Sequence, residues 1–407
     1  KKHGLEILRF KTGTPSRVDR RSLHMDKMEL EEGDPENHAF SFMSERKDRN
    51  KRNCWLTYTN EKTHEIIREN IMRAPKYAGK IHGIGARYCP SIEDKVVRFA
   101  DKDRHQLFVE PEGLDTTEMY VQGMSTSMPI DVQYAFLRTI PGFEDVKMMR
   151  PAYAIEYDLL DPLQLYPTLE VIKLPGLYSA GQSNGTSGYE EAAAQGLVAG
   201  INAALKIQGK DPFILARHEA YIGSLVDDLV TKGADEPYRM MTSRSEYRLI
   251  LRQDNADLRL TEKGHSIGLV GEERYARFLE RKKKYEEAMD YIRTQRFTPK
   301  EEINRALESM GTAPLTTGTG ADQILKRPEM TYRKMMEILG CPSFDEEAVE
   351  EMEITVKYEG YIARQEAAVR KAARMENEKL PLDMDYLSLD GISTEARQKM
   401  DKIRPLS

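Results

Sequence analysis

The segment from Lys173 to Lys206 constrains the fold of this 407-residue chain more than any other. Leu177 to Ala180 predict a short strand, and a helix is predicted from Tyr189 or Glu190 onward. Between them lies a glycine-rich crossing that contains Gly181, Gln182, Asn184, Gly185 and Gly188. Such an order can form a cradle for an anion or a cofactor. The spacing does not match G-x-G-x-x-G, so an ordinary structural turn stays equally open.

The chain changes character near residue 207. Before it, strand-like and helix-like patterns alternate. The predicted strands are 5–10, 54–60, 106–110, 119–121 and 150–162, and the predicted helices are 63–74 and 130–139. After residue 207 the pattern predicts helices, at 219–233, 272–295, 328–339, 345–375 and near the end. The predicted fold class is therefore α/β followed by all-α.

A second constraint is the segment IHGIGARYCPSIEDKVVRF. Its apolar residues recur at helical spacing, at Ile92, Val96 and Phe99. Because Pro90 suits the first helical position, Cys89 is expected at or beside the helix N-cap. The helix dipole and Arg87 would stabilise a thiolate there. A buried, unreactive cysteine fits the same residues, since that is where free cysteines are usually found.

Two further motifs have two interpretations each. Lys11 to Arg17, KTGTPSR, predicts a tight turn that faces a phosphate or a cofactor edge, or an ordinary turn. Arg244, Arg248 and Arg252 recur four residues apart, so on a helix they would share a face that could meet a phosphate backbone. Pairing with Glu246, Asp254 and Asp257 is the alternative. The run Arg281 to Lys284 is expected to be solvated.

Composition excludes several classes of protein. No run approaches the roughly 18 apolar residues that a membrane span needs. The net charge of −6 argues against a generally basic nucleic-acid binder, although a local basic surface is still allowed. The 3 cysteines are far apart and include no C-x-x-C, so neither a disulfide framework nor a metal site is expected. A reducing cytoplasm is the expected location.

Several motifs in fixed order carry a resemblance to one family. They are FKTGTPSR, RYCPSIEDK, EGLDTTEMYVQGMSTSMP, RPAYAIEYD, AGQSNGTSGYEEAAAQGLVAG and PYRMMTSRSEYRLILRQDNAD. Together they span essentially the whole chain, and they resemble the MnmG (GidA) family of flavoproteins, which modify the wobble uridine of tRNA.

The resemblance implies a fold and a domain order. A glutathione-reductase-like FAD domain would contribute residues 1–22 and 124–207. An inserted α/β domain for dinucleotide and substrate would occupy 23–123, and a helical domain for tRNA and partner binding would occupy 208–407. The sequence opens without the glycine-rich FAD fingerprint, so we expect a fragment that binds FAD weakly, is inactive alone and lacks the extreme C-terminus.

The resemblance also implies an activity. Members of this family place an aminomethyl or carboxymethylaminomethyl group on C5 of uridine 34. They use FAD, NADH and methylenetetrahydrofolate, act as homodimers and work with the GTPase MnmE. Two alternatives stay open, a folate- and FAD-dependent tRNA uridine methyltransferase and a truncated chain that only binds a partner.

The family's site residues map onto this sequence as follows. Cys89 corresponds to an active-site cysteine, and Gln182 to a glutamine that contacts the flavin. The family's dinucleotide segment corresponds to Gly85, Ala86, Arg87, Tyr88, Pro90, Ser91, Ile92, Val96, Val97, Arg98 and Phe99. Further cofactor contacts are expected at Thr12, Gly13, Thr14, Asn184 and Gly185, and tRNA contacts at Arg244, Arg248 and Arg252. Glu93, Asp94 and Lys95 are candidate proton carriers or orienting groups, with an exposed helix face as the alternative.

Overall fold

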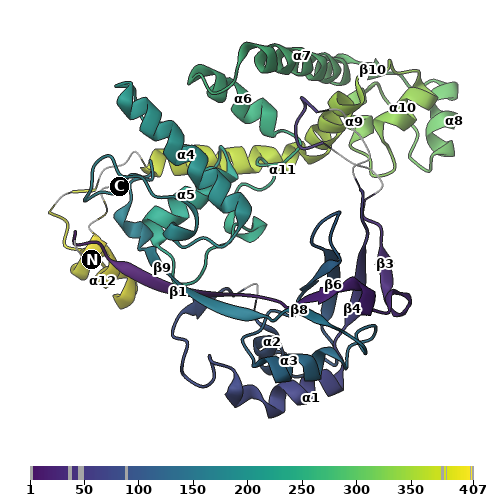
Figure 1. Ribbon diagram of the computed structural model, residues 1–407. Coiled ribbons are helices and arrows are strands. Elements are labelled where there is room, and N and C mark those ends of the chain that lie inside the picture. Colours follow the sequence, from purple (N-terminus) through teal and green to yellow (C-terminus); the bar gives the residue numbers. More distant parts are fainter. Residues whose placement is uncertain are drawn as a thin grey trace. The chain divides into compact units, whose positions relative to one another are not determined.

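A computed structural model describes residues 3–34, 39–44, 50–87, 90–376, 380–381, 383–403 and 405 (Figure 1). The chain forms two compact units. The first is Lys1–Arg217 with Tyr221–Arg244, and the second is His218–Ala220 with Ser245–Ser407. Strands and helices mix in the first unit and helices dominate the second, which confirms the predicted fold class.

Two sheets build the first unit. The smaller has the order β5 (Ile84–Gly85), β1 (Ile7–Thr14) and β9 (Tyr153–Leu160). The larger has the order β3 (Glu29–Glu31), β4 (Cys54–Tyr58), β6 (Gln106–Pro111), β7 (Glu118–Gln122), β2 (Arg17–Asp19) and β8 (Met148–Arg150). Because β1 and β2 are separated by only two residues, the chain passes directly from one sheet into the other.

Helices cover one side of the larger sheet. They are α1 (Glu61–Glu69), α2 (Ile92–Arg98) and α3 (Ile130–Leu137), which Figure 1 shows grouped together. Val109 and Val121 from the sheet and Phe136 from α3 lie in one core, each fully buried. Two further helices, α4 (Tyr189–Ile207) and α5 (Tyr221–Lys232), pack beside the smaller sheet, where Val198 and Val226 share a core with Leu160.

Three local predictions are wrong. Thr12 to Pro15 do not form the predicted tight turn, because β1 stays paired with β9 as far as Thr14 opposite Tyr153. Leu177 to Ala180 is not a strand, and only Tyr178 forms an isolated bridge. The first helix begins at Glu61 and its N-cap is Asn60 rather than Thr63, since the Asn60 side chain accepts from the Thr63 N–H and Thr63 completes a capping box.

Among the described residues of the second unit, the regular structure is helical apart from one short ribbon. Its helices are α6 (Ala256–Ser266), α7 (Glu272–Thr294), α8 (Glu301–Ser309), α9 (Ala321–Leu325), α10 (Tyr332–Leu339), α11 (Glu346–Glu376) and α12 (Thr394–Ile403). The ribbon pairs β10 (Arg296–Phe297) with β11 (Thr319–Gly320). The core of the second unit contains Ile292, Leu307, Ile324 and Met335, all fully buried.

Three residues upstream of α5 complete the second unit. The Glu219 carboxylate pairs with Lys263, and the Glu219 carbonyl accepts from Arg259. The His218 ring packs edge-on against Tyr247, with 6.2 Å between ring centroids. The second unit is therefore assembled from two separate stretches of the chain.

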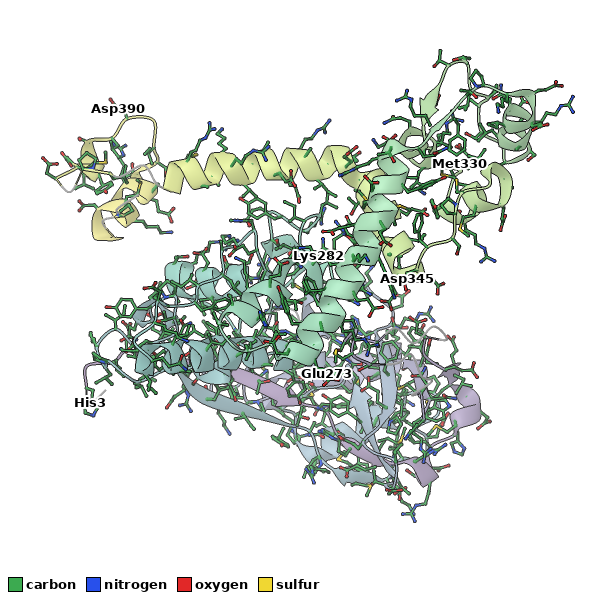
Figure 2. All side chains as sticks on the ribbon, turned by 90° about the horizontal axis from the view of Figure 1, so that it is seen from above. His3, Glu273, Lys282, Met330, Asp345 and Asp390 are labelled. Atoms are coloured by element: carbon green, nitrogen blue, oxygen red, sulfur yellow. The ribbon has the colours of Figure 1, made fainter. Side chains whose placement is uncertain are left out.

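The basic run of α7 is paired with acids, and half of it is exposed. Arg281 bridges Asp257 at 2.6 Å and also pairs with Glu347. Lys282 pairs with Glu262 at 2.7 Å, and Lys284 lies 3.4 Å from Asp345. Figure 2 shows Lys282 midway along α7, with Asp345 beside it. The prediction of a solvated run is wrong for Arg281 and Lys282, because α6 and α11 place acids beside them, and it is confirmed for Lys283 and Lys284, which are exposed.

The domain boundaries predicted from sequence fall inside packed layers. β2 pairs with both β7 and β8, so residues on either side of 22/23 and 123/124 belong to one sheet. The boundary at 207/208 precedes α5, whose Leu225 and Leu229 lie in the core of the first unit. In the part of the chain that the structure describes, no helix is long and apolar enough to cross a membrane.

Candidate functional site

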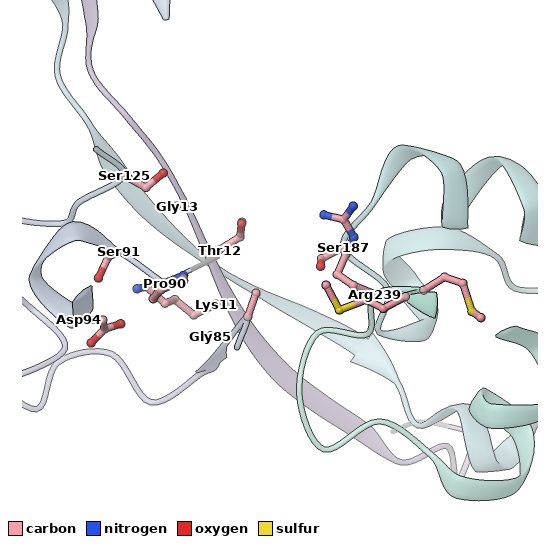
Figure 3. Close-up of a pocket in the computed structure, with 13 residues that line it drawn as sticks. Lys11, Thr12, Gly13, Gly85, Pro90, Ser91, Asp94, Ser125, Ser187 and Arg239 are labelled. Carbon is pink, nitrogen blue, oxygen red and sulfur yellow. The ribbon is translucent and has the colours of Figure 1, made fainter. Parts of the chain in front are cut away.

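A cavity of about 240 Å³ lies beside β1 and β5 of the smaller sheet in the first unit. Its lining comes from β1, the residues around α2, the loop after β7 and the segments flanking α4 and α5. The lining residues are Lys11, Thr12, Gly13, Gly85, Ala86, Pro90, Ser91, Asp94, Ser125, Ser187, Arg239, Met240 and Met241. Figure 3 shows Pro90, Ser91 and Asp94 on one side, Ser187 and Arg239 on the other, and Thr12 and Gly85 between them.

The α2 side of the cavity is built around Asp94, which is 6% exposed. Its carboxylate accepts from Lys76 Nζ at 2.6 Å and from the Tyr77 hydroxyl at 3.0 Å. Burial alone would raise the pKa of Asp94, but these two hydrogen bonds outweigh it and hold that pKa below its ordinary value. Burial and the neighbouring carboxylate raise the pKa of Tyr77 to about 12. Asp94 is therefore an ionised carboxylate at neutral pH, and its Oδ1 accepts both hydrogen bonds.

The lining of the cavity includes a lysine side chain. Lys11 lies in β1 and is only 6% exposed. No residue that the structure describes accepts a hydrogen bond from its Nζ. The positive charge of Lys11 helps to lower the pKa of Asp94. Ser91, the N-cap residue of α2, presents a buried hydroxyl that likewise has no partner among the described residues. Buried polar atoms without partners mark a place where a ligand can complete the hydrogen bonding.

The opposite wall is organised by Glu191 in the first turn of α4. One of its carboxylate oxygens, Oε1, accepts from Arg239 Nε at 3.1 Å and from the Met240 N–H at 2.7 Å. Glu191 is 4% exposed, whereas the Arg239 side chain is 41% exposed. This arrangement pins the Arg239 guanidinium by one edge and leaves its other edge toward the cavity.

The predicted glycine-rich crossing forms a separate cradle behind this wall. Residues Gly181–Asn184 make a 3-10 turn that leads to Gly185, whose φ of +82° suits glycine. The Asn184 side chain is fully buried and donates to the Ser179 carbonyl and to Gln195 Oε1, while its own Oδ1 has no partner among the described residues. Gln182 is exposed on the same turn. The cradle is next to the cavity in sequence but does not line it.

The structure brings together a good part of the predicted site. Seven predicted site residues line the cavity, namely Thr12, Gly13, Gly85, Ala86, Pro90, Ser91 and Asp94. Glu93 is fully buried and accepts from the Ser127 N–H and hydroxyl, and Lys95 Nζ donates to the Gly123 carbonyl at 3.2 Å. The alternative of an exposed helix face is therefore wrong for Glu93 and Asp94.

Other predicted cofactor residues lie elsewhere. Ile92 and Val96 are buried in the core of the larger sheet. Arg87, Val97, Arg98 and Phe99 are exposed, and Phe99 is the C-cap residue of α2 rather than part of its buried face. Thr14 ends β1, where its hydroxyl accepts from Arg17. Pro90 is not the first helical residue as predicted, because α2 begins at Ile92 and its N-cap is Ser91. Tyr88 and Cys89 lie outside the described residues, so the predicted thiolate stays a prediction.

The arginine row does not share a helical face. Arg244 ends a 3-10 turn in the first unit, where its guanidinium lies 4.3 Å from the centre of the Tyr238 ring. Arg248 and Arg252 belong to turns of the second unit. Arg252 pairs with Asp254 at 3.0 Å and with Glu351 at 2.5 Å, so the pairing alternative holds for this residue. The helical premise of the prediction is wrong because 245–255 forms turns.

Sequence reasoning missed half of the cavity. Lys11 was read only as part of a turn, and Ser125, Ser187, Arg239, Met240 and Met241 were not predicted as site residues. Arg239 comes from a segment more than a hundred residues away from α2 and carries no periodicity of its own. The only sequence signal for it is its place in PYRMMTSRSEYR, one of the motifs that carry the resemblance.

Three family models match the chain in order. "Glucose inhibited division protein A" matches residues 1–211. "tRNA modifying enzyme MnmG/GidA C-terminal helical domain" matches 272–366, and the corresponding "C-terminal helical bundle" matches 368–407. The first model alone covers more than half of the chain, including every residue of the cavity's α2 side.

Relatives with curated names show the same similarity over the whole chain. The "tRNA uridine 5-carboxymethylaminomethyl modification enzyme MnmG" of Caldicellulosiruptor saccharolyticus is 55% identical over 408 residues, covering 100% of this chain and 65% of the relative. Its counterpart in Clostridium kluyveri is 56% identical over 405 residues, covering 99% of this chain and 64% of the relative. The chain thus spans slightly less than two thirds of the length of these relatives.

A solved structure confirms the fold. Aquifex aeolicus GidA in its form II crystal superposes with a TM-score of 0.84 at 45% identity, covering 100% of this chain and 64% of that one. The form I crystal gives the same TM-score at 46% identity. On the family models, the sequence identities and this fold together, the chain belongs to the MnmG/GidA family of tRNA-modifying enzymes.

Proposed function

We propose that the complete product of this gene is a flavin-dependent enzyme that adds a carboxymethylaminomethyl or aminomethyl group to C5 of uridine 34 in tRNA. It would act as a homodimer with the GTPase MnmE and use FAD, NADH and methylenetetrahydrofolate. The observation that carries the proposal is the cavity, because residues of β1, β5 and α2 converge on it, and all of them lie within the region that matches the family model.

The cavity fits part of a cofactor or a base, not a whole dinucleotide. Its volume of about 240 Å³ is below the roughly 300–1,000 Å³ of typical ligand pockets. The unpartnered Ser91 hydroxyl and the Lys11 ammonium offer hydrogen-bond donors to carbonyl oxygens of a flavin edge or of uracil. FAD would supply the redox chemistry and methylenetetrahydrofolate the carbon, and the Asn184 and Gln182 turn is the proposed flavin contact.

The chain's own residues would act on the uracil ring. We assign Cys89 as the nucleophile whose thiolate adds to C6, so that the electron pair of the C5–C6 bond moves toward C5 and the C4 oxygen. C5 can then bond to the incoming carbon, and loss of the C5 proton expels the thiolate. Asp94 is better suited to orient Lys76, Tyr77 and Lys11 than to take that proton, since a lowered pKa makes a weak base.

Nucleoside analysis of tRNA tests this proposal. The complete gene product is incubated with MnmE, GTP, FAD, NADH, methylenetetrahydrofolate, an amine donor and tRNA that lacks the modification. We expect the modified uridine to form with the wild-type protein and to fall at least about a hundredfold with Cys89→Ser, because the nucleophile is lost. Cys54→Ser is the matched control, since Cys54 lies in β4, away from the cavity.

The alternatives give different products. A tRNA uridine methyltransferase would produce 5-methyluridine at another position of the tRNA without the GTPase. A chain that only binds a partner would retain MnmE binding and produce no modified nucleoside. Full activity of Cys89→Ser would remove the assignment of the nucleophile while leaving the family's reaction in place.

A further inference from the structure

The wall formed by Glu191 and Arg239 has a geometry that packing alone does not require. Glu191 is the third residue of α4, a position from which a glutamate usually reaches back to the N-cap N–H. Here the N-cap is Gly188, and Glu191 instead turns its Oε1 to Arg239 and to the Met240 N–H. The carboxylate therefore links the start of α4 to the cavity-lining segment 239–241.

Space for this link exists only because residue 188 is glycine. A Cβ atom built on Gly188 would lie 1.7 Å from Glu191 Oε2 and 2.9 Å from Arg239 Nε. Neither separation is possible for a real methyl group. The Glu191 Oε2 atom is buried and has no hydrogen-bond partner among the described residues. The fold thus keeps a buried carboxylate in this place even though one of its oxygens stays unsatisfied, which costs free energy.

The consequence falls on Arg239. Its Nε is occupied by Glu191, whereas no described residue binds its two terminal nitrogens. A guanidinium held by Nε presents the Nη1 and Nη2 groups as a flat fork, the geometry that suits two oxygens of one phosphate. Figure 3 shows Arg239 and Ser187 together across the cavity from Asp94. Lys11 adds a second cation to the cavity lining.

We infer that Glu191 is a positioning residue that holds Arg239 edge-on, so that the free edge of the guanidinium binds a phosphate group entering the cavity. This inference rests on the proposed function for the source of the phosphate, which is either a phosphodiester of the substrate RNA or a phosphate of a dinucleotide. The site itself follows from the contacts of Glu191, Arg239 and Gly188.

The sign of one mutational effect separates positioning from simple electrostatics. Removing a carboxylate beside an anion site should strengthen anion binding if the carboxylate acts only through its charge. If Glu191 positions Arg239, Glu191→Ala should weaken phosphate binding, roughly tenfold, as expected when a charge-assisted fork loses its orientation. Arg239→Gln should weaken it by at least as much, and the double variant should lose no more than Arg239→Gln alone.

The experiment titrates the 407-residue chain with three probes: inorganic pyrophosphate, NADH and a short anticodon stem-loop RNA. For the RNA, affinity is measured at several salt concentrations. Loss of one phosphate contact should lower the slope of log affinity against log salt by about 0.7, equally in Glu191→Ala and Arg239→Gln. Glu190→Gln is the matched control, because it removes the same charge from the neighbouring, exposed residue and should leave the slope unchanged.

Two further variants guard against a loss of folding. Gly188→Ala should reproduce the Glu191→Ala effect without removing any charged group, because its methyl group displaces the carboxylate. Arg239→Lys keeps the charge but not the fork, and should recover less than half of the lost affinity. Each variant is checked by far-ultraviolet circular dichroism before titration.

The outcomes are distinct. Glu191-dependent loss of RNA binding assigns the phosphate to RNA, and Glu191-dependent loss of NADH binding assigns it to a dinucleotide. Equal or tighter binding of all three probes by Glu191→Ala overturns the inference. If pyrophosphate binding depends on Glu191 but the complete gene product leaves tRNA unmodified, the phosphate site stands and the proposed function fails.

Discussion

At the scale of single residues, the site depends on carboxylates whose hydrogen bonds are already made. Asp94 binds Lys76 and Tyr77, and Glu191 binds Arg239 and the Met240 N–H. Neither oxygen that makes these bonds is available to accept a substrate proton. Through these oxygens the two residues set the positions and charges of their neighbours.

The pH dependence of Asp94 gives a first prediction. Its folded-state pKa lies below the unfolded value of about 3.9, so its contribution to stability is present above pH 4 and is lost as pH falls through the folded pKa. We expect Asp94→Asn to lower the free energy of unfolding at pH 7 by roughly 1.5–3 kcal/mol, the range for hydrogen bonds to a charged group. The difference from wild type should shrink below pH 4.

Tryptophan fluorescence in urea measures this difference. The chain has 1 tryptophan, Trp55, which packs against the core that also contains α2. Asp131→Asn serves as the control, because Asp131 is an acid of the same unit with an arginine partner, Arg73, but on the surface. If both variants lowered stability equally, the burial of Asp94 would have no special role.

At the scale of elements, α11 is tied to the turns before α6 by a buried acid cluster. Glu351 is 5% exposed and shares Arg252 with Asp254. Burial and the neighbouring Asp254 carboxylate raise the pKa of Glu351 to about 8. A group whose acid form is favoured by folding destabilises the folded state as pH rises from the unfolded pKa, about 4.3, toward the folded one.

We therefore expect the stability of the second unit to fall between pH 5 and pH 8, and Glu351→Gln to reduce that fall. Amide hydrogen exchange in peptides from α11, followed at pH 5, 6.5 and 8 with correction for the intrinsic exchange rate, measures it. Glu350→Gln changes the preceding, exposed glutamate and should leave the pH dependence as in wild type. An equal response in both variants would contradict the role given to burial.

Elements were predicted well wherever local pattern decided them. The bounds of α4, α7 and α11 agree with the sequence to within a residue or two, because each has long periodicity or a clear start. The tight turn predicted after Lys11 was wrong because β9, about 140 residues later, extends the pairing of β1. The four-residue spacing of Arg244, Arg248 and Arg252 indicated a helix that the chain does not form, since spacing alone carries no information about packing.

The same difference between local pattern and packing decides which residues of the candidate site could be predicted. The motif around Asp94 is continuous in sequence, so the α2 side of the cavity was found. Arg239 and Ser187 reach the cavity only through the packing of α4 and α5, and no local pattern marks them. The family resemblance supplied the activity and the roles of Cys89 and Gln182, which composition and periodicity could not provide.

At the scale of the whole molecule, the two units have separate cores. Phe136 lies in the core of the first unit and Leu307 in that of the second, and both are fully buried. Cores that share no residues can lose stability independently. The chain should therefore not unfold as a single two-state system.

This leads to a prediction with an internal control. Phe136→Ala should lower the stability of the first unit by roughly 3–5 kcal/mol, and Leu307→Ala that of the second by roughly 2–5 kcal/mol. Trp55 fluorescence reports the first unit alone. The urea midpoint of its unfolding should therefore be lower in Phe136→Ala than in wild type, and unchanged in Leu307→Ala. Hydrogen exchange in α8 should give the reverse pattern. A shift of the fluorescence midpoint by Leu307→Ala would mean that the units unfold together.

The short stretch His218–Ala220 has a consequence for biosynthesis. Translation delivers Glu219 before its partner Lys263, which follows 44 positions later, while the residues on both sides of the stretch are claimed by the first unit. While the first unit folds during synthesis, these three residues must stay out of its packing until α6 has emerged from the ribosome. A gene divided after codon 244 would give a downstream product without Glu219, and only mixing of the two products could restore that ion pair.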